Sequence, residues 1–358
     1  MLQDDPGMPL ASIIKNINTL YSYTISYKKA WLERTKAIKI LFGDWDESYK
    51  KLPTYLNALK AINPGTVVEH VLTPTDTPGE VHLKYLFWAF KPVIDGFRYC
   101  APVISIDGTH LYGKYKGKLL VAIASTSGGN VFPLAFALVD EETTDAWSWF
   151  IFHLRTRVVP GRPDLTLISD RAQGILTAVQ NFWETPIAGQ PVGYHRWCLR
   201  HVCSNFNTRV HDVKLRDMLW RAGSAHQKRK LNVTIQSLSE LLPPDERGRL
   251  NLGWKWIQDN LMHHVDKWTL SHDDGRRWGV LTTNNAECFN NVLKGARNLP
   301  PTAFVQLTFY RMVKYFNKYR TLAKLDARNQ QLIPKQVHNK IFAYQTKGNS
   351  YDIVAYDR

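Results

Sequence analysis

The stretch ISIDGTHLYGKYKGKLLVAIASTS, residues 104–127, contains two apolar runs separated by a basic turn rich in glycine, and the first run ends at Asp107. The pattern predicts strands at 102–107 and 118–126, and a third strand follows at 131–139 after another short turn. Strands this close along the chain pair as an antiparallel meander. The question for function is why a strand suited to burial ends in an acid.

The elements that follow answer this question in outline. An aromatic helix (144–158) leads to a fourth strand at 164–169, which ends at Asp170, and a helix then leads to a fifth strand at 192–199. A right-handed crossover places the fourth strand parallel to the first and beside it. The sequence thus predicts an α/β fold with a ribonuclease H-like mixed five-stranded sheet. Asp107 and Asp170 should meet at its carboxyl edge, where open sheets of this kind bind ligands.

The remaining segments are predicted to be mainly helical. Four parts are expected: an N-terminal helical and β-rich region, the first part of the sheet core, a basic helical insertion, and C-terminal core helices that carry a further acid. Their predicted limits are 1–98, 99–202, 203–280 and 281–358.

Composition narrows the class of protein. The chain has 358 residues, 44% of them hydrophobic, and a net charge of +15. Residues 181–358 hold 27 Lys and Arg against 14 Asp and Glu, which is +13 of that total. This balance predicts a polyanionic partner that binds mainly to the second half. Four cysteines, an acidic start without the features of a secretory signal, and no run of about 20 apolar residues predict a soluble intracellular protein, with no membrane partner.

The chemistry of paired acids indicates a metal site. Two neighbouring aspartates repel unless a cation lies between them, and hard oxygen ligands favour Mg²⁺ or Mn²⁺. A third carboxylate, for which Glu287 is the best candidate, would complete a two-ion site for phosphodiester chemistry. The alternative for each Asp is a turn or cap residue. The polar helix face of Glu287, opposite an apolar stripe, faces either solvent or a cleft; the stripe comprises Phe289, Val292, Leu293 and Ala296.

Several motifs resemble one known family. The run from 105 onward, with DGTHL, SDRAQGI, HRWCLRH and TTNNAECFNN in this order, is similar to the transposase domain of plant Mutator-like elements. The resemblance implies a DDE transposase core in which Asp107, Asp170 and Glu287 bind two Mg²⁺ or Mn²⁺ ions. It further implies a metal-dependent nuclease and strand transferase that acts on DNA in the nucleus. Because transposition needs paired DNA ends, the mechanism implies a homo-oligomer.

The same resemblance includes CLRH, with Cys198 and His201 as the Cys-x-x-His signature of the family. A thiolate and an imidazole three residues apart could share zinc, with His195 or Cys203 as further ligands. Alternatively, Cys198 packs in the core and His201 forms a local hydrogen bond or contacts DNA. The N-terminal DNA-binding region and C-terminal SWIM-type zinc finger usual in the family have no counterpart here. We therefore expect a truncated or degenerate copy, or a part of a longer protein.

Basic side chains of the second half are candidates for phosphate contacts, which are independent of DNA sequence and sensitive to salt. QKRK, residues 227–230, is also a short candidate signal for nuclear import. The candidates are Arg196, Arg200, Lys228, Arg229, Lys230, Arg276, Arg277, Lys294 and Arg297.

Two further functions stay open beside the transposase reading. One is a domesticated, non-catalytic derivative that binds DNA and regulates transcription. The other is a nuclease that acts on RNA–DNA hybrids and shares the metal chemistry. Neither the DNA ends that are recognised nor catalytic competence follows from the sequence.

Overall fold

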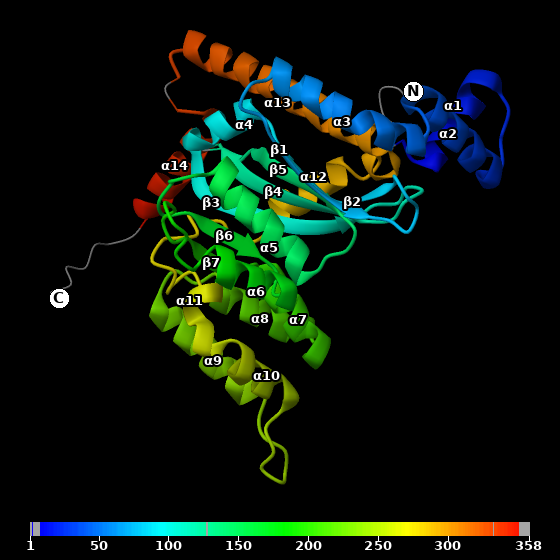
Figure 1. The fold of residues 1–358 in the computed structure, drawn as a ribbon. Helices are drawn as coiled ribbons and strands as arrows, with labels where there is room; N and C mark the ends of the chain where they lie inside the picture. The colour runs from blue at the N-terminus through cyan, green and yellow to red at the C-terminus, as the bar shows by residue number, and fades with distance from the viewer. Residues whose placement is uncertain (1, 3–7, 127, 332, 351–358) are drawn as a thin grey trace.

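The computed structural model describes residues 2, 8–126, 128–331 and 333–350. A mixed sheet of seven strands forms its centre, in the order β1-β2-β5-β4-β3-β6-β7 (Figure 1). The strands are β1 Val67–Pro74, β2 Val81–Ala89, β3 Cys100–His110, β4 Lys118–Thr126, β5 Val131–Val139, β6 Thr166–Ser169 and β7 Tyr194–Trp197.

The strand count differs from the prediction of five. The β1 and β2 strands form an antiparallel pair, and β2 joins the edge of β5 through the register Tyr85↔Val139 to Trp88↔Phe136. The end of β2 reads as an unbroken apolar run and is fully buried because helices cover both faces of the sheet there. The two β-rich stretches before residue 98 therefore extend the sheet.

The remaining strands overlap the predicted ranges, but β3 begins two residues earlier and continues three residues beyond Asp107, and β6 and β7 are shorter than predicted. β3, β4 and β5 pair antiparallel, whereas β3, β6 and β7 run parallel. The predicted turn at 127–130 and the predicted lack of a secretory signal in residues 1–10 involve residues outside the described part.

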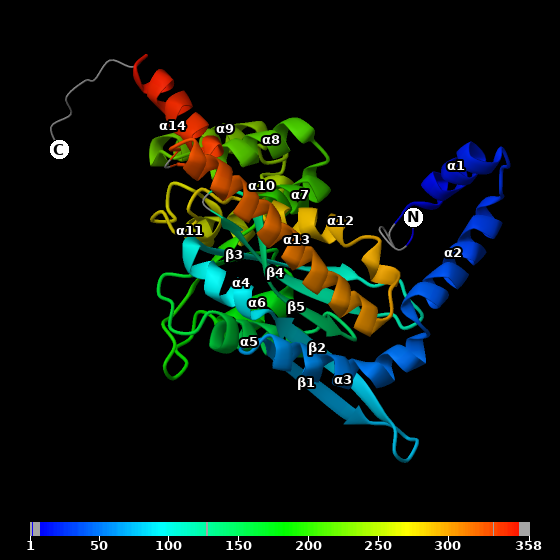
Figure 2. The ribbon, with the colours of Figure 1, turned by 90° about the horizontal axis from the view of Figure 1, so that it is seen from above.

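Helices cover the sheet on two sides. Phe87 contacts Phe150 of α5, whereas the next residue of β2, Trp88, contacts Phe304 of α13 on the opposite face. The helices α5 (Thr144–His153) and α6 (Gln173–Phe182) pack together on one side, and α5 continues as a π-helical turn, Leu154–Val158. The helices α12 (Asn284–Val292) and α13 (Pro301–Arg328) lie on the other side, as Figure 2 shows from above.

Three N-terminal helices precede the sheet: α1 Leu10–Tyr21, α2 Tyr27–Phe42 and α3 Trp45–Ile62. The α3 helix packs along α13, whereas α1 and α2 extend away from the sheet (Figure 2). Pro53 lies inside α3, which continues on both sides of it. The short α4, Lys91–Gly96, leads into β3 through a 3₁₀ turn.

A second hydrophobic cluster, separate from that of the sheet, forms between residues 197 and 268. It is built around buried Phe206, Leu219, Leu238 and Trp268. The helices that contribute are α7 Leu199–Val210, α8 Val213–Gly223, α9 Lys228–Leu241, α10 Leu252–Asn260 and α11 Val265–Trp268. They project from the β7 side of the sheet (Figure 1). The last helix is α14, Lys335–Gly348. In the part of the chain that the structure describes, no helix is both long and apolar enough to cross a bilayer.

Candidate active site

The register of β3 against β6 brings two aspartates together. Val103 pairs with Thr166 and Ser105 with Ile168 in a parallel ladder. The ladder ends two residues before Asp107 and Asp170, and the charge of Asp170 acts on Asp107 at this edge of the sheet. Neighbouring strands lie about 4.8 Å apart, so the two carboxyl groups are close enough to interact. Asp107 lies inside β3 rather than at its end, because β3 continues to His110 against β4.

Asp107 occupies a largely buried position. Its Oδ2 accepts a hydrogen bond of 2.8 Å from Nδ2 of Asn290 on α12. Burial raises the pKa of Asp107 to about 6, and the negative charge of Asp170 adds to this, although Asn290 and His201 oppose the rise. The surrounding residues therefore offset only part of the energetic cost of ionising Asp107. Such a carboxylate is suited to bind a cation.

Asp170 follows the last residue of β6 and leads into α6. Its Oδ1 accepts a hydrogen bond of 3.0 Å from the backbone N–H of Ala172. This bond is the turn interaction that the sequence offered as the alternative to a catalytic role. A carboxylate has about four acceptor positions, so the turn and a cation site are compatible.

Glu287 faces the start of α7 and not open solvent, with a side chain that is 21% exposed. Its Oε1 accepts a hydrogen bond of 3.2 Å from Oγ1 of Thr283 and lies 3.8 Å from Nε2 of His201. Its Oε2 forms an ion pair with the guanidinium of Arg200. Binding of a cation by Glu287 would therefore compete with Arg200.

The Cys-x-x-His pair lies beside this third acid. Burial opposes ionisation of the Cys198 thiol, but its interactions with His201 and Thr283 dominate and lower its pKa to about 7. The interaction with Cys198 in turn raises the pKa of His201. Both the backbone N–H and the hydroxyl of Thr283 lie 3.4 Å from Sγ of Cys198. The pair therefore links the start of α7 to the start of α12.

The two further zinc ligands considered from sequence have other surroundings. Nε2 of His195 lies 2.8 Å from the hydroxyl of Ser169, and burial lowers the pKa of His195 to about 3. Burial raises the pKa of Cys203 to about 12, which opposes formation of a thiolate ligand. Within residues 8–126, 128–331 and 333–350, no group of three or more His, Cys, Asp and Glu side chains is arranged to hold a metal ion.

The donor types nevertheless fit a hard divalent cation. Asp107 and Asp170 supply two carboxylates near each other. Burial makes the negative charge of Asp107 unfavourable, and a bound cation would offset this unfavourable energy. Glu287 belongs to a helix that packs on β3 and β4, but its carboxylate is held by Arg200.

The sequence pattern of α12 missed Asn290. The buried positions on this segment are Ala286, Phe289, Asn290 and Leu293, spaced i, i+3, i+4 and i+7. Val292, which the predicted stripe included, is 40% exposed, and Ala296 is buried but lies beyond the end of the helix. A polar residue at a core position of the helical repeat is the signal that could have identified Asn290.

Three of the nine basic candidates need correction, because Arg196, Arg277 and Arg297 are buried. Arg196 donates to the carbonyl of His195 and Arg277 to that of Trp197. The guanidinium of Arg297 donates to the carbonyl of Asn290. Their charges hold loops and helix ends together inside the protein and do not form a surface for phosphate.

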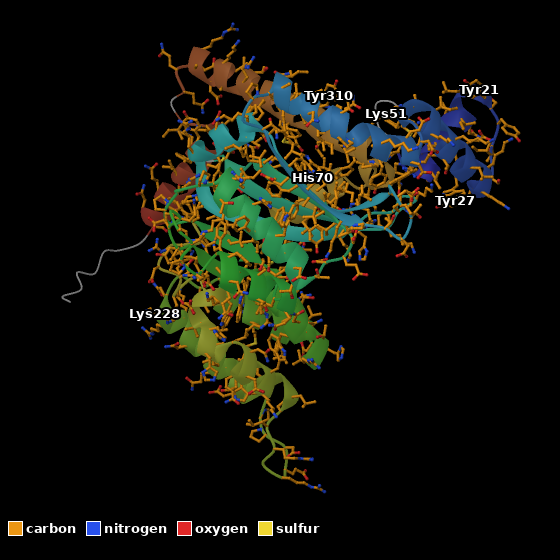
Figure 3. All side chains as sticks on the ribbon, viewed as in Figure 1. Tyr21, Tyr27, Lys51, His70, Lys228 and Tyr310 are labelled. Atoms are coloured by element: carbon orange, nitrogen blue, oxygen red, sulfur yellow. The ribbon has the colours of Figure 1, made fainter. Side chains whose placement is uncertain are left out.

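The other basic candidates reach solvent to different degrees. Lys228, Arg229, Lys230 and Lys294 are exposed, and Figure 3 shows Lys228 on the outer side of the insertion. Arg276 is partly exposed, pairs with Asp164 at 2.6 Å and lies over the ring of Tyr194. Arg200 is half exposed and is the candidate nearest to the acids.

The fold is a mixed α/β fold with Asp107 on β3, Asp170 directly after the neighbouring parallel strand β6, and Glu287 on α12, which packs on β3 and β4. The family model of the MULE transposase domain matches residues 103–205, which supports a Mutator-like transposase. The matched segment contains Asp107, Asp170, Cys198 and His201 but ends before Glu287. No curated protein matches the chain.

Proposed function

We propose that this chain is the catalytic domain of a DDE-type transposase that cuts and joins DNA with two divalent ions. The observation that carries the proposal is the parallel β3–β6 ladder, which ends two residues before Asp107 and Asp170, together with the effect of the Asp170 charge on the pKa of Asp107. The family match over residues 103–205 supports it independently.

The strand order also supports a ribonuclease H-like core. Without β1 and β2, the order is β5-β4-β3-β6-β7, with three antiparallel strands followed by two that run parallel to β3. We assign β1 and β2 as an extension at the β5 edge, which lies away from the acids.

Each acid has a distinct role in this proposal. Asp107 and Asp170 would hold the ions, and Glu287 would supply a further ligand to one of them. When bound, Mg²⁺ or Mn²⁺ would promote ionisation of the attacking water and neutralise charge on the scissile phosphate. The protein orients the carboxylate of Asp107 through Asn290 and largely buries it.

Arg200 fits a role at the boundary between the acids and DNA. Its half-exposed guanidinium pairs with Glu287, and a phosphate is an equally suitable partner for the same planar donor. We propose that Arg200 changes partner when DNA binds. Its guanidinium would leave Glu287 for a DNA phosphate, and the carboxylate of Glu287 would then be available to a cation.

The DNA surface in this proposal is sequence-independent. Exposed Lys228, Arg229, Lys230 and Lys294 would bind phosphates, and removal of any one of these charges should reduce the salt dependence of binding. The exposed QKRK segment fits a nuclear location, and the need for paired DNA ends fits a homo-oligomer.

A cleavage assay tests this proposal. Asp107→Asn, Asp170→Asn and Glu287→Gln should each abolish Mg²⁺- or Mn²⁺-dependent nicking of DNA. Asp164→Asn is the matched control, because Asp164 is an exposed carboxylate paired with Arg276 and lies before the start of β6, whereas Asp170 follows its end. Equal nicking by wild type and Asp107→Asn would refute the assignment. A parallel RNA–DNA hybrid substrate separates a transposase from a hybrid nuclease.

A second candidate function is a non-catalytic regulator that keeps the fold to bind DNA. The ion pair between Arg200 and Glu287 favours it, because this pair satisfies the third acid without a cation. Calorimetry with Mg²⁺ and Mn²⁺ at millimolar concentration discriminates the two. DNA binding without any ion binding would favour the regulator.

A further inference from the structure

Asn290 stands out among the polar residues of α12 because it is almost completely buried, at 4% exposure. Its amide Nδ2 donates to Asp107, whereas its Oδ1 has no hydrogen-bond partner among the described residues. A buried amide oxygen that has no hydrogen-bond donor costs roughly 1–3 kcal/mol. The hydrogen bond that the Asn290 side chain makes in this buried position is the one to Asp107.

The position of Asn290 on its helix connects two of the acids. It lies three residues after Glu287, so the two side chains project from neighbouring turns of α12. The carbonyl of Asn290 is itself held by the buried guanidinium of Arg297, at 2.6 Å. The amide that reaches Asp107 therefore belongs to a fixed backbone and not to a mobile loop.

We propose that Asn290 is a positioning residue of the acid cluster, which fixes the carboxylate of Asp107 for cation binding and ties β3 to the helix that carries Glu287. The hydrogen bond occupies one acceptor position of Asp107 and leaves others for the ion. This inference rests on the proposed function, since it assigns a role within the same site. Hydrogen bonds of this kind to metal ligands typically change metal affinity by about 10–100-fold.

The same helix offers a matched control. Asn285 also projects from α12 toward the sheet, and its Nδ2 donates to the hydroxyl of Ser125 on β4 at 2.6 Å. It anchors the helix but contacts none of the three acids through this bond. A purely structural role of Asn290 would make the two asparagines equivalent.

The test compares Asn290→Leu and Asn285→Leu by Mn²⁺ titration calorimetry of the full chain, with melting curves recorded in parallel. Leucine keeps the volume of the side chain but cannot donate. We expect Asn290→Leu to weaken Mn²⁺ binding about tenfold or more and Asn285→Leu to change it less than about twofold, although both lower the melting temperature. Wild-type affinity in Asn290→Leu, or equal weakening in both variants, would overturn the inference.

A second variant covers the case in which Asn290→Leu does not fold. Asn290→Asp keeps the shape but places a carboxylate against Asp107, so its melting temperature should rise more on addition of Mn²⁺ than that of wild type. An equal rise contradicts the inference. Absence of Mn²⁺ binding by wild type, or normal binding by Asp107→Asn, refutes the proposed function itself. Binding that is lost in Asp107→Asn but kept in Asn290→Leu refutes only the role of Asn290.

Discussion

Replacement of Asp107 by Asn is expected to stabilise the ion-free protein while it removes the response to divalent ions. The carboxyl of Asp107 has a pKa of about 6 in place of its ordinary 3.8, because burial disfavours its charged form. The folded state therefore holds this proton more tightly than the unfolded state. The unfolding free energy therefore falls as pH rises from about 4 to about 6. Above the folded-state pKa of about 6, this decrease is complete.

The size of the effect follows from the pKa. At about 1.4 kcal/mol per pH unit, the ionised Asp107 costs about 3 kcal/mol near pH 8 and well under 1 kcal/mol near pH 4. Asparagine at this position carries no charge and can still accept the hydrogen bond from Asn290 through its amide oxygen. The variant should thus gain up to about 3 kcal/mol in unfolding free energy at pH 8, and little at pH 4.

The assay is urea unfolding of wild type and Asp107→Asn at pH 4.5 and pH 8, each with EDTA and with Mg²⁺. With EDTA, the variant should be the more stable protein at pH 8, and the difference should shrink at the lower pH. With Mg²⁺, wild type should gain stability and the variant should not. A variant that is less stable than wild type at pH 8 in EDTA would refute the electrostatic reasoning.

The remaining predictions concern two arginines and one lysine. Arg200→Gln should strengthen Mn²⁺ binding in the absence of DNA, because it frees Glu287, and weaken DNA binding; unchanged ion affinity in calorimetry would contradict this. Arg277→Met should lower the unfolding free energy by about 3 kcal/mol or more, because it leaves the buried carbonyl of Trp197 without its donor and Asp273 without its charge partner, as urea titration can measure. Lys228→Ala should leave stability within about 0.5 kcal/mol and reduce the salt slope of DNA binding by about one, and an unchanged slope would remove Lys228 from the DNA surface.

Much of the sheet could be predicted from sequence because its signals are local. The apolar runs and short turns around residues 104–139 determine the antiparallel strands, and the crossover rule then places β6 parallel to β3 and beside it. The addition of β1 and β2 was missed, because which edge a hairpin joins depends on tertiary contacts such as that between Trp88 and Phe304.

The environment of the acids was harder to predict than their positions. The sequence alone does not show whether a charged residue is buried. Arg277 is predicted to be a surface cation, although its guanidinium is fully buried. In the sequence, Asn290 stands among other polar residues. Only the packing of α12 on the sheet shows that its side chain contacts Asp107. The placement of Glu287 came from resemblance to a family, since helical periodicity did not distinguish solvent from cleft.

Crystals soaked in Mn²⁺ and recorded at the manganese absorption edge test the central claim most directly. The account predicts an anomalous peak between the carboxylates of Asp107 and Asp170, at coordination distances of about 2.1 Å, with Glu287 turned from Arg200 toward the ion. Density that shows Glu287 still paired with Arg200, and no peak beside Asp107 at millimolar Mn²⁺, would contradict it.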